Sequence, residues 1–487
     1  MHSLIQIFKE GEAMKLVKLS LVAALAAGSF SVLEAAKPLE DAIKNVQLGG
    51  FMWYRYDSGR FKDGINLDAG GIGYTQVHRY RVGLTANVDL GEGFRAVGMF
   101  LYNDQNNPSF HNSYSNTNFA IGQAKIDSPF WLKQAYIQYN NADAGLSISL
   151  GRQNLNTIWT DDFAGMMAKI TLRPTDEVTV GVFGVDSFQN LADDSGRFQY
   201  YNTLELDANG GTTGTAIGVA MSNRLYKENL YGANVLGNFG PLKAEIWGAH
   251  WDKTATLYAL KLDFDLGVFR VHANYLGNSV DGVFKTDTGL GDIMGNGNLA
   301  NLKLAFKVAG FDANVGGIYF GAKDKFTINT IEEPFGNDSD LYIGSEIFYQ
   351  QGSYGNISFG QNAYGYVGVG YTLPAQIRIG LKGVFGATMN DDAKKATAGQ
   401  LLNPSGTVAV GDYTIHGANG GGTKMEGVAE ISWQATKGLN FLAYYSYLHT
   451  SAKDGVVSEV DSSNNPTAFG KVNSAKNTVR FQARYAF

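Results

Sequence analysis

Two adjacent carboxylates stand out among the residues that could do chemistry. They are Asp161 and Asp162, in the stretch LGRQNLNTIWTDDFAG, residues 150–165. Carboxylates that face guanidinium groups across a narrow aqueous gap produce a transverse field that orients water and selects ions. The alternative is that these acids belong to an external turn. The basic residues that would face them lie near the two ends of the chain: Arg55, Arg79, Arg81, Arg95, Arg480 and Arg484.

Other acids cluster in polar stretches of the chain. Asp193 and Asp194 are adjacent, and so are Glu332 and Glu333. Calcium requires several oxygen ligands, which loop acids supply if the loops that carry them fold together. Solvated loop acids are the commoner explanation of such clusters. The candidate calcium ligands are Asp161, Asp162, Asp193, Asp194 and Glu332, and no other cofactor is expected.

The sequence contains no recognised arrangement for catalysis. G-x-S-x-G, H-E-x-x-H and G-x-x-x-x-G-K-[ST] motifs are missing, and the lysine of NGGGTK, residues 419–424, is in the wrong order for a phosphate loop. The seven histidines lack the spacing of metal ligands. We therefore expect a protein that is not an enzyme.

Apolar and polar residues alternate along most of the chain. In the last ten residues, TVRFQARYAF, apolar positions from Val479 to Phe487 alternate with Arg480, Gln482 and Arg484. This period of two predicts β-strands with one apolar and one polar face. Segments 165–186 and 228–252 alternate poorly. The pattern recurs in KNVQLGGFMWYRYD (44–57), RYRVGLTANVDL (79–90), FRVHANY (269–275), NLKLAFKV (301–308) and QIRIGLKGVF (376–385).

The connections between these segments alternate in length. One connection, near 251–254, is shorter than its place in the series predicts. Counting gives about eighteen strands of about 9–11 residues, with short turns at one end and long loops at the other. Short turns lie at 90–93, 141–145, 173–177, 238–241, 265–267, 309–311, 373–375 and 435–438. Long polar stretches lie near 58–75, 104–129, 187–227, 278–298, 322–361, 388–422 and 451–475.

Composition supports a strand-rich membrane protein. The 487 residues include 61 glycines and no cysteine, and only 17% are charged. Without disulfides, a closed hydrogen-bonded barrel is one way to hold an exported chain together. The net charge of -6, with no basic stripe, argues against a nucleic-acid partner.

The N-terminal region predicts export. MKLVKLSLVAALAAGSFSVLEAA, residues 14–36, has the order of charge, apolar run and small residues of a cleaved signal peptide. We interpret residues 1–13 as a product of an upstream start and residues 37–487 as the mature protein. Beyond Ala36 no apolar stretch is long enough for a spanning helix. The first strand begins soon after the expected cleavage site and the last ends at Phe487, so no plug or appended domain is expected.

These features together predict an all-β fold: a transmembrane antiparallel β-barrel of about eighteen strands, porin-like, with its apolar parity in lipid and its charged parity in water. The connection after the fifth strand, which carries Asp161 and Asp162, is expected to fold inward. Closure would then place the last strand beside the first three, so that their arginines face these acids. A soluble β-sandwich is the alternative for each strand taken singly.

The chain resembles the campylobacter-type major outer membrane porins from the signal through the terminal strand. The resemblance implies an eighteen-stranded trimeric channel for small hydrophilic solutes, with cation preference and a calcium ion near the constriction. The constriction role carries over to Asp161. For a further acid of that family, this shorter segment offers Asp162 or Ala164. The matching stretches are MKLVKLSLVAALAAGSFS, PLEDAIKNV (38–46), YRYDSGRF (54–61), GRQNLNTIWTD (151–161), VDSF (185–188), YLGNS (275–279) and EIFY (346–349).

The expected function is therefore that of a porin in a Gram-negative outer membrane, which passes small hydrophilic solutes and ions by passive diffusion and prefers cations. Its expected partners are outer-membrane lipid, lipopolysaccharide and two further copies in a homotrimer. Two alternatives remain open. One is a substrate-specific channel for sugars or carboxylates, and the other is an adhesive surface barrel that uses its long loops.

Overall fold

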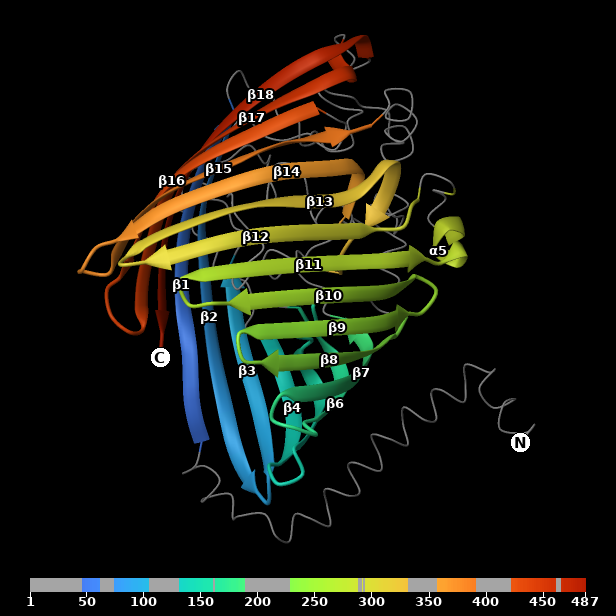
Figure 1. The fold of residues 1–487 in the computed structure, drawn as a ribbon, viewed down its shortest axis with the longest axis vertical. Coiled ribbons are helices and arrows are strands. Elements are labelled where there is room, and N and C mark those ends of the chain that lie inside the picture. The colour runs from blue at the N-terminus through green and yellow to red at the C-terminus, as the bar shows by residue number, and fades with distance from the viewer. Residues whose placement is uncertain are drawn as a thin grey trace, which may run out of the picture.

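The structure is a computed structural model that describes residues 46–61, 74–104, 131–160, 163–188, 228–287, 291, 294–331, 357–390, 422–460 and 466–487. The proposed upstream start and signal peptide, residues 1–36, lie outside these ranges. The described chain forms one antiparallel sheet of eighteen strands that closes on itself (Figure 1). The prediction of an eighteen-stranded barrel is thereby confirmed.

The strands follow one another around the barrel in sequence order. Among the described residues, no helix is long and apolar enough to cross a membrane. A single helical turn, α5 (Gly282–Asp287), lies at the loop end of the barrel. The strands are β1 (Val46–Phe61), β2 (Tyr74–Gly91), β3 (Phe94–Asp104), β4 (Trp131–Asn141), β5 (Leu146–Asn154), β6 (Ala164–Leu172), β7 (Val178–Phe188), β8 (Leu230–Phe239), β9 (Leu242–Trp251), β10 (Ala255–Asp265), β11 (Phe269–Val280), β12 (Asn298–Val308), β13 (Phe311–Ile328), β14 (Ile357–Thr372), β15 (Ile377–Met389), β16 (Gly422–Gln434), β17 (Leu439–Val460) and β18 (Pro466–Ala486).

The barrel closes by pairing its first strand with its last. β1 pairs antiparallel with both β2 and β18, and Phe51 lies opposite Ala486. The ladder continues to the end of the chain, because Phe487 and Gly50 exchange two backbone hydrogen bonds of 3.0 Å. A closed sheet leaves no edge whose N–H and C=O groups would face lipid unpaired.

The turns at one end of the barrel are short, as predicted. Glu92–Gly93 and Ala309–Gly310 each have positive φ at both residues, between 49° and 84°. This is the type I′ geometry, whose twist matches that of the strands it joins. At Gly93 an added Cβ would lie 2.3 Å from the carbonyl oxygen of Asn140, so this turn also requires glycine for a close backbone approach.

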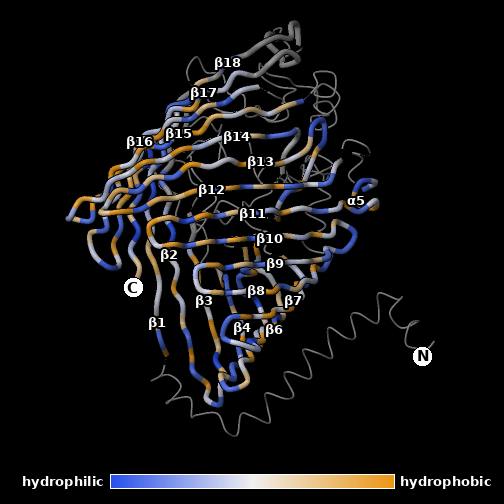
Figure 2. Tube along the Cα trace, viewed as in Figure 1, coloured by the Kyte–Doolittle hydropathy of each residue, from blue (hydrophilic) through white to orange (hydrophobic). Residues whose placement is uncertain are grey.

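The two faces of the sheet differ in chemistry, as Figure 2 shows by the alternation of hydropathy along each strand. On the outer parity of β1, Leu48 is 77% exposed and Met52 is 57% exposed. On the inner parity, Trp53 and Asp57 are buried. Cross-strand partners share a face, so the register extends the apolar outer surface around the whole barrel.

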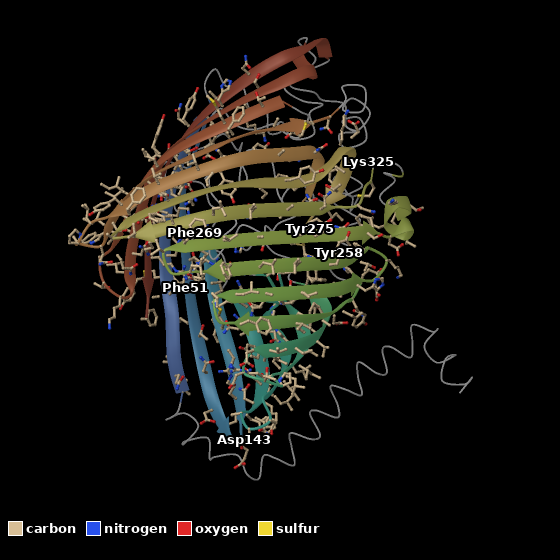
Figure 3. The ribbon with its side chains drawn as sticks, in the orientation of Figure 1. Phe51, Asp143, Tyr258, Phe269, Tyr275 and Lys325 are labelled. Carbon is tan, nitrogen blue, oxygen red and sulfur yellow. The ribbon has the colours of Figure 1, made fainter. Side chains whose placement is uncertain are left out.

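Aromatic side chains occupy both ends of this outer surface. At the turn end, Phe269 begins β11, and the rings of Phe306 and Phe311 contact with centroids 6.3 Å apart. Nearer the loop end, Tyr258 on β10 and Tyr275 on β11 contact with centroids 6.3 Å apart (Figure 3). Aromatic rings at two levels with aliphatic residues between them are typical of membrane barrels.

Strands β6 to β9 explain why segments 165–186 and 228–252 alternate poorly. Toward the loop end their inner face is apolar too, and it carries Phe183, Val185, Leu230, Trp247 and Trp251, all buried. Strand β7 also contains a bulge: the neighbouring residues Met166 and Met167 of β6 pair with Ser187 and Val185, so Asp186 is the extra residue. Where the wall is apolar on both faces, the period of two is lost.

Candidate functional site

The inner face of the barrel holds the candidate site, and one part of it is the inward connection between β5 and β6. The backbone N–H of Leu155 donates to the carbonyl of Phe163 at 2.9 Å, which closes the connection at its base. A turn lies between them, where the N–H of Thr160 donates to the carbonyl of Thr157 at 3.1 Å. Leu155, Trp159 and Phe163 are all buried.

Trp159 anchors this connection to the inner wall. Its side chain has no exposed surface, and its ring meets that of Trp247 edge to face with centroids 6.0 Å apart. Trp247 lies opposite Asn234 and Ala259 in the ladder, on the parity opposite to the exposed Ile246. The connection after the fifth strand therefore folds into the barrel, as the sequence predicted.

The apolar cover continues along the wall toward β13. Phe284 of α5 is fully buried, and Met294 forms a parallel bridge with Phe326. Asn278 at the end of β11 holds this part together: its side chain accepts from the N–H of Gly297 at 2.9 Å and donates to the carbonyl of Ile328. One inner sector of the barrel, from β6 to β13, is thus a packed apolar cluster at the loop end.

A second inner sector, at the closure of the barrel, is basic. The register places Arg55 opposite Gln482 on one side and Arg79 on the other. Two residues earlier in β1, on the same face, Trp53 lies opposite Arg484 and Arg81. We call this group, with Asp57 and Arg480, the closure seam. It forms because strands at the two ends of the sequence become neighbours when the sheet closes.

The side chains of the closure seam are held in defined contacts. Arg480 Nε donates to Asp57 Oδ1 at 2.5 Å, and both side chains are nearly buried. Arg55 donates to Gln482 Oε1 at 3.2 and 3.1 Å, and its guanidinium carbon lies 4.2 Å from the centre of the Trp53 ring. Such stacking and two N–H donors on one oxygen fix a guanidinium group in place.

The predicted wall arginines lie where the closure argument placed them. Arg55, Arg81, Arg480 and Arg484 project from the inner parity of β1, β2 and β18. Arg95 lies nearer the turn end of β3, opposite Asp89, and its Nε donates to Gln138 at 2.7 Å. Arg79 occupies the same ladder position as Arg55, and its side chain lies outside the described residues.

The acidic half of the predicted site lies outside the described residues. These positions are Asp161, Asp162, Asp193, Asp194 and Glu332, so the acid pair and the calcium ligands stay predictions. Within the described ranges, no group of three or more His, Asp or Glu side chains is arranged to hold a metal ion.

A third inner sector, which the sequence analysis did not assemble, carries charges of both signs near the turn end. Arg378 on β15 donates to Asp312 on β13 at 2.9 and 2.6 Å and also to Glu430 on β16. Lys382 lies 2.7 Å from the second oxygen of Glu430. The polar parity of each strand was visible in the sequence. Finding these ion pairs required the register of strands that are 52 to 66 residues apart.

This charged sector continues over β9 to β11. Lys261 lies 3.5 Å from Glu245 and 3.8 Å from Asp263. Asp263 also contacts Nδ1 of His272, and Arg270 contacts Asp265 at 2.5 Å. Because every one of these groups has the inner parity, the barrel interior is lined by charges while its exterior is apolar.

The fold is shared with solved outer-membrane proteins of low sequence identity. OccAB4 of Acinetobacter baumannii is 11% identical, with a TM-score of 0.51 over 91% of this chain and 98% of that one. OpdK of Pseudomonas aeruginosa, solved with vanillate, is 11% identical, with a TM-score of 0.54 over 91% and 99%. OpdQ of the same organism is 10% identical, with a TM-score of 0.53 over 91% and 99%. The comparison with curated proteins gave no match.

An apolar exterior, a charged interior and a closed sheet define the class: the protein has the fold of an outer-membrane β-barrel, which these neighbours share. The sequence model of the Campylobacter major outer membrane protein family matches residues 14–472 of this chain. The chain belongs to that family, and it is a porin of the outer membrane. The resemblance inferred from the sequence is thus confirmed.

Proposed function

We propose that the barrel is a water-filled channel through which small hydrophilic solutes and ions diffuse passively. The observation that carries this proposal is the charged inner parity of a closed barrel whose outer parity is apolar. Arg270 and Asp265 keep 47% and 43% of their side-chain surface exposed, which an interior without water would not tolerate. The inward connection anchored by Trp159 narrows the interior on one side and leaves size exclusion as the main filter.

We further propose that the channel prefers cations because of Asp161 and Asp162. Much of the basic charge on the wall already has an acidic partner: Arg480 pairs with Asp57, and Arg378 lies between two carboxylates. Two adjacent acids at a constriction then set the sign of the field that a permeating ion meets. The flanking residues Thr160 and Phe163 belong to the inward connection, which supports a place for these acids in the barrel interior.

The prediction is that Asp161→Asn with Asp162→Asn lowers the ratio of cation to anion permeability by at least about twofold at low salt, where screening is weakest. The measurement is the reversal potential of purified protein in a planar bilayer under a salt gradient. Asp143→Asn, in the turn between β4 and β5, removes one exposed acid away from the inward connection and serves as the control. An unchanged reversal potential in the double variant removes the assignment of these acids.

The same recordings test the assembly and the ion. We propose a homotrimer in lipid and lipopolysaccharide, for which conductance should appear in steps that close in thirds; single independent steps would contradict it.

We also propose calcium on Asp161, Asp162, Asp193, Asp194 and Glu332. Chelation of calcium should then change the selectivity of the unaltered protein and leave the double variant unaffected, and identical selectivity with and without chelator would rule this ion out.

A second candidate function is a channel specific for carboxylates, and the closure seam favours it. Arg55, Arg81 and Arg484 share one stretch of inner wall with Asp57 and Arg480, so basic groups outnumber acids there. Guanidinium groups bind carboxylates in a bidentate manner. Saturable block of the ionic current by one carboxylate, with anion preference, would select this function over general diffusion.

A further inference from the structure

A cavity lies against the inner wall of β10 to β13 near the turn end, away from both the closure seam and the inward connection. Its volume is about 270 Å³. The charged and titratable side chains that line it come from all four strands: Asp265, Arg270, His272, Lys303, Lys307 and Asp312. Nothing in the proposed diffusion function requires a cavity at this position.

His272 is the most constrained of these groups. Its side chain is only 3% exposed, and its Nδ1 contacts Asp263 Oδ1. Its Nε2 is buried without a hydrogen-bond partner, although the ring lines the cavity. A buried polar atom without a partner is costly, and here a ligand in the cavity would supply the partner.

The charges around the cavity favour an anion. The two lining carboxylates are already engaged: Arg270 Nη2 lies 2.5 Å from Asp265, and Arg378 holds Asp312 at 2.9 and 2.6 Å. Lys307 lines the same space and makes no ion pair with the part of the chain that the structure describes. The cavity therefore combines a buried imidazole nitrogen with a lysine whose ladder partner, Asp312, is already held by Arg378.

We propose that this cavity binds an oxyanion, the carboxylate or phosphate group of a small solute, between His272 Nε2 and the ammonium of Lys307. In such a complex Nδ1–H of His272 donates to Asp263 and Nε2–H donates to the ligand. Lys303, opposite His272 in the ladder, adds positive charge at the edge of the site. Because the short turns of membrane barrels face the periplasm, the site lies where a solute leaves the channel.

This inference rests on the proposed channel function for its role, and its test is independent of conduction. Binding of succinate and of inorganic phosphate to the purified protein in detergent micelles is measured by titration calorimetry. His272→Asn keeps an amide N–H for Asp263 and removes the second ring nitrogen. Lys307→Gln removes the charge from an exposed position. Lys437→Gln, in the turn between β16 and β17, removes one charge at the same end of the barrel and is the control.

We expect the dissociation constant to rise by about tenfold in each of the two site variants and by less than about twofold in the control. Succinate binding without phosphate binding identifies a carboxylate site, and the reverse identifies a phosphate site. Absence of binding to the unaltered protein, or equal affinity in all three variants, overturns the proposal. Bilayer conductance of the same preparations separates the two ideas, because binding without conductance leaves the site and removes the channel.

Discussion

Leu84→Arg should lower the free energy of unfolding by about 2–4 kcal/mol, whereas Thr85→Arg, at the next residue, should change it by less than about 1 kcal/mol. Leu84 lies on the outer parity of β2 and is 47% exposed. Its ladder partners are Gly50 and Phe100, and Phe100 is 52% exposed on the same outer face. An arginine there would sit in hydrocarbon. Thr85 has the inner parity, so an arginine at that position would be hydrated.

The measurement is reversible unfolding in denaturant with the protein reconstituted in lipid vesicles. Both variants introduce the same side chain, so the main difference between them is the face of the sheet on which the arginine lies. Equal destabilisation by the two arginines would show that the outer surface is not lipid-facing. Greater destabilisation at Thr85 would mean that the two faces have been assigned the wrong way round.

Trp159→Ala should release the inward connection and raise single-channel conductance. Trp159 is the main anchor of the inward connection, because its side chain has no exposed surface and its ring meets that of Trp247 edge to face. Truncation of a buried tryptophan to alanine costs about 3–5 kcal/mol. Because the strands pair with one another and not with this connection, we expect the loss to act locally and the barrel to remain closed.

Hydrogen exchange at the amide of Leu155, which donates to the carbonyl of Phe163, reports the local opening. Its exchange rate should rise by at least about a hundredfold, in line with the expected local free energy. Trp433→Ala is the matched control, because Trp433 lies on the outer face, 44% exposed. Wild-type conductance and unchanged exchange in Trp159→Ala would show that the connection is held by other contacts.

The fold was predictable because few arrangements of a chain can form a membrane barrel. Alternation at residues such as Arg480, Gln482 and Arg484 requires a strand with one wet face, and short turns between long loops require hairpins in sequence order. The closure seam followed from closure alone, since β18 must pair with β1. Segments 165–186 and 228–252 alternate poorly for a physical reason. Strands β6 to β9 carry Trp247 and its apolar neighbours on the inner face, beneath the inward connection.

The charged sector could not be derived from the sequence. Asp312, Arg378 and Glu430 lie on three strands, and whether they meet depends on strand tilt and register, which hydropathy does not encode. The contact between Asp263 and His272 has a local origin instead, because a hairpin pairs them across the short turn between β10 and β11. Parity predicted which residues face inward, and only the register showed which of them touch.

The central claim is that the apolar parity faces lipid and the charged parity faces a hydrated channel. The chain contains no cysteine, so single cysteines can be placed one at a time in β18 at Val479, Phe481, Gln482, Ala483 and Arg484. With the protein in vesicles, a charged thiol reagent that does not enter lipid should label positions 482 and 484 and reduce the ionic current. Positions 479, 481 and 483 should stay unlabelled. Labelling that ignores parity, or that favours the odd positions, would contradict the account.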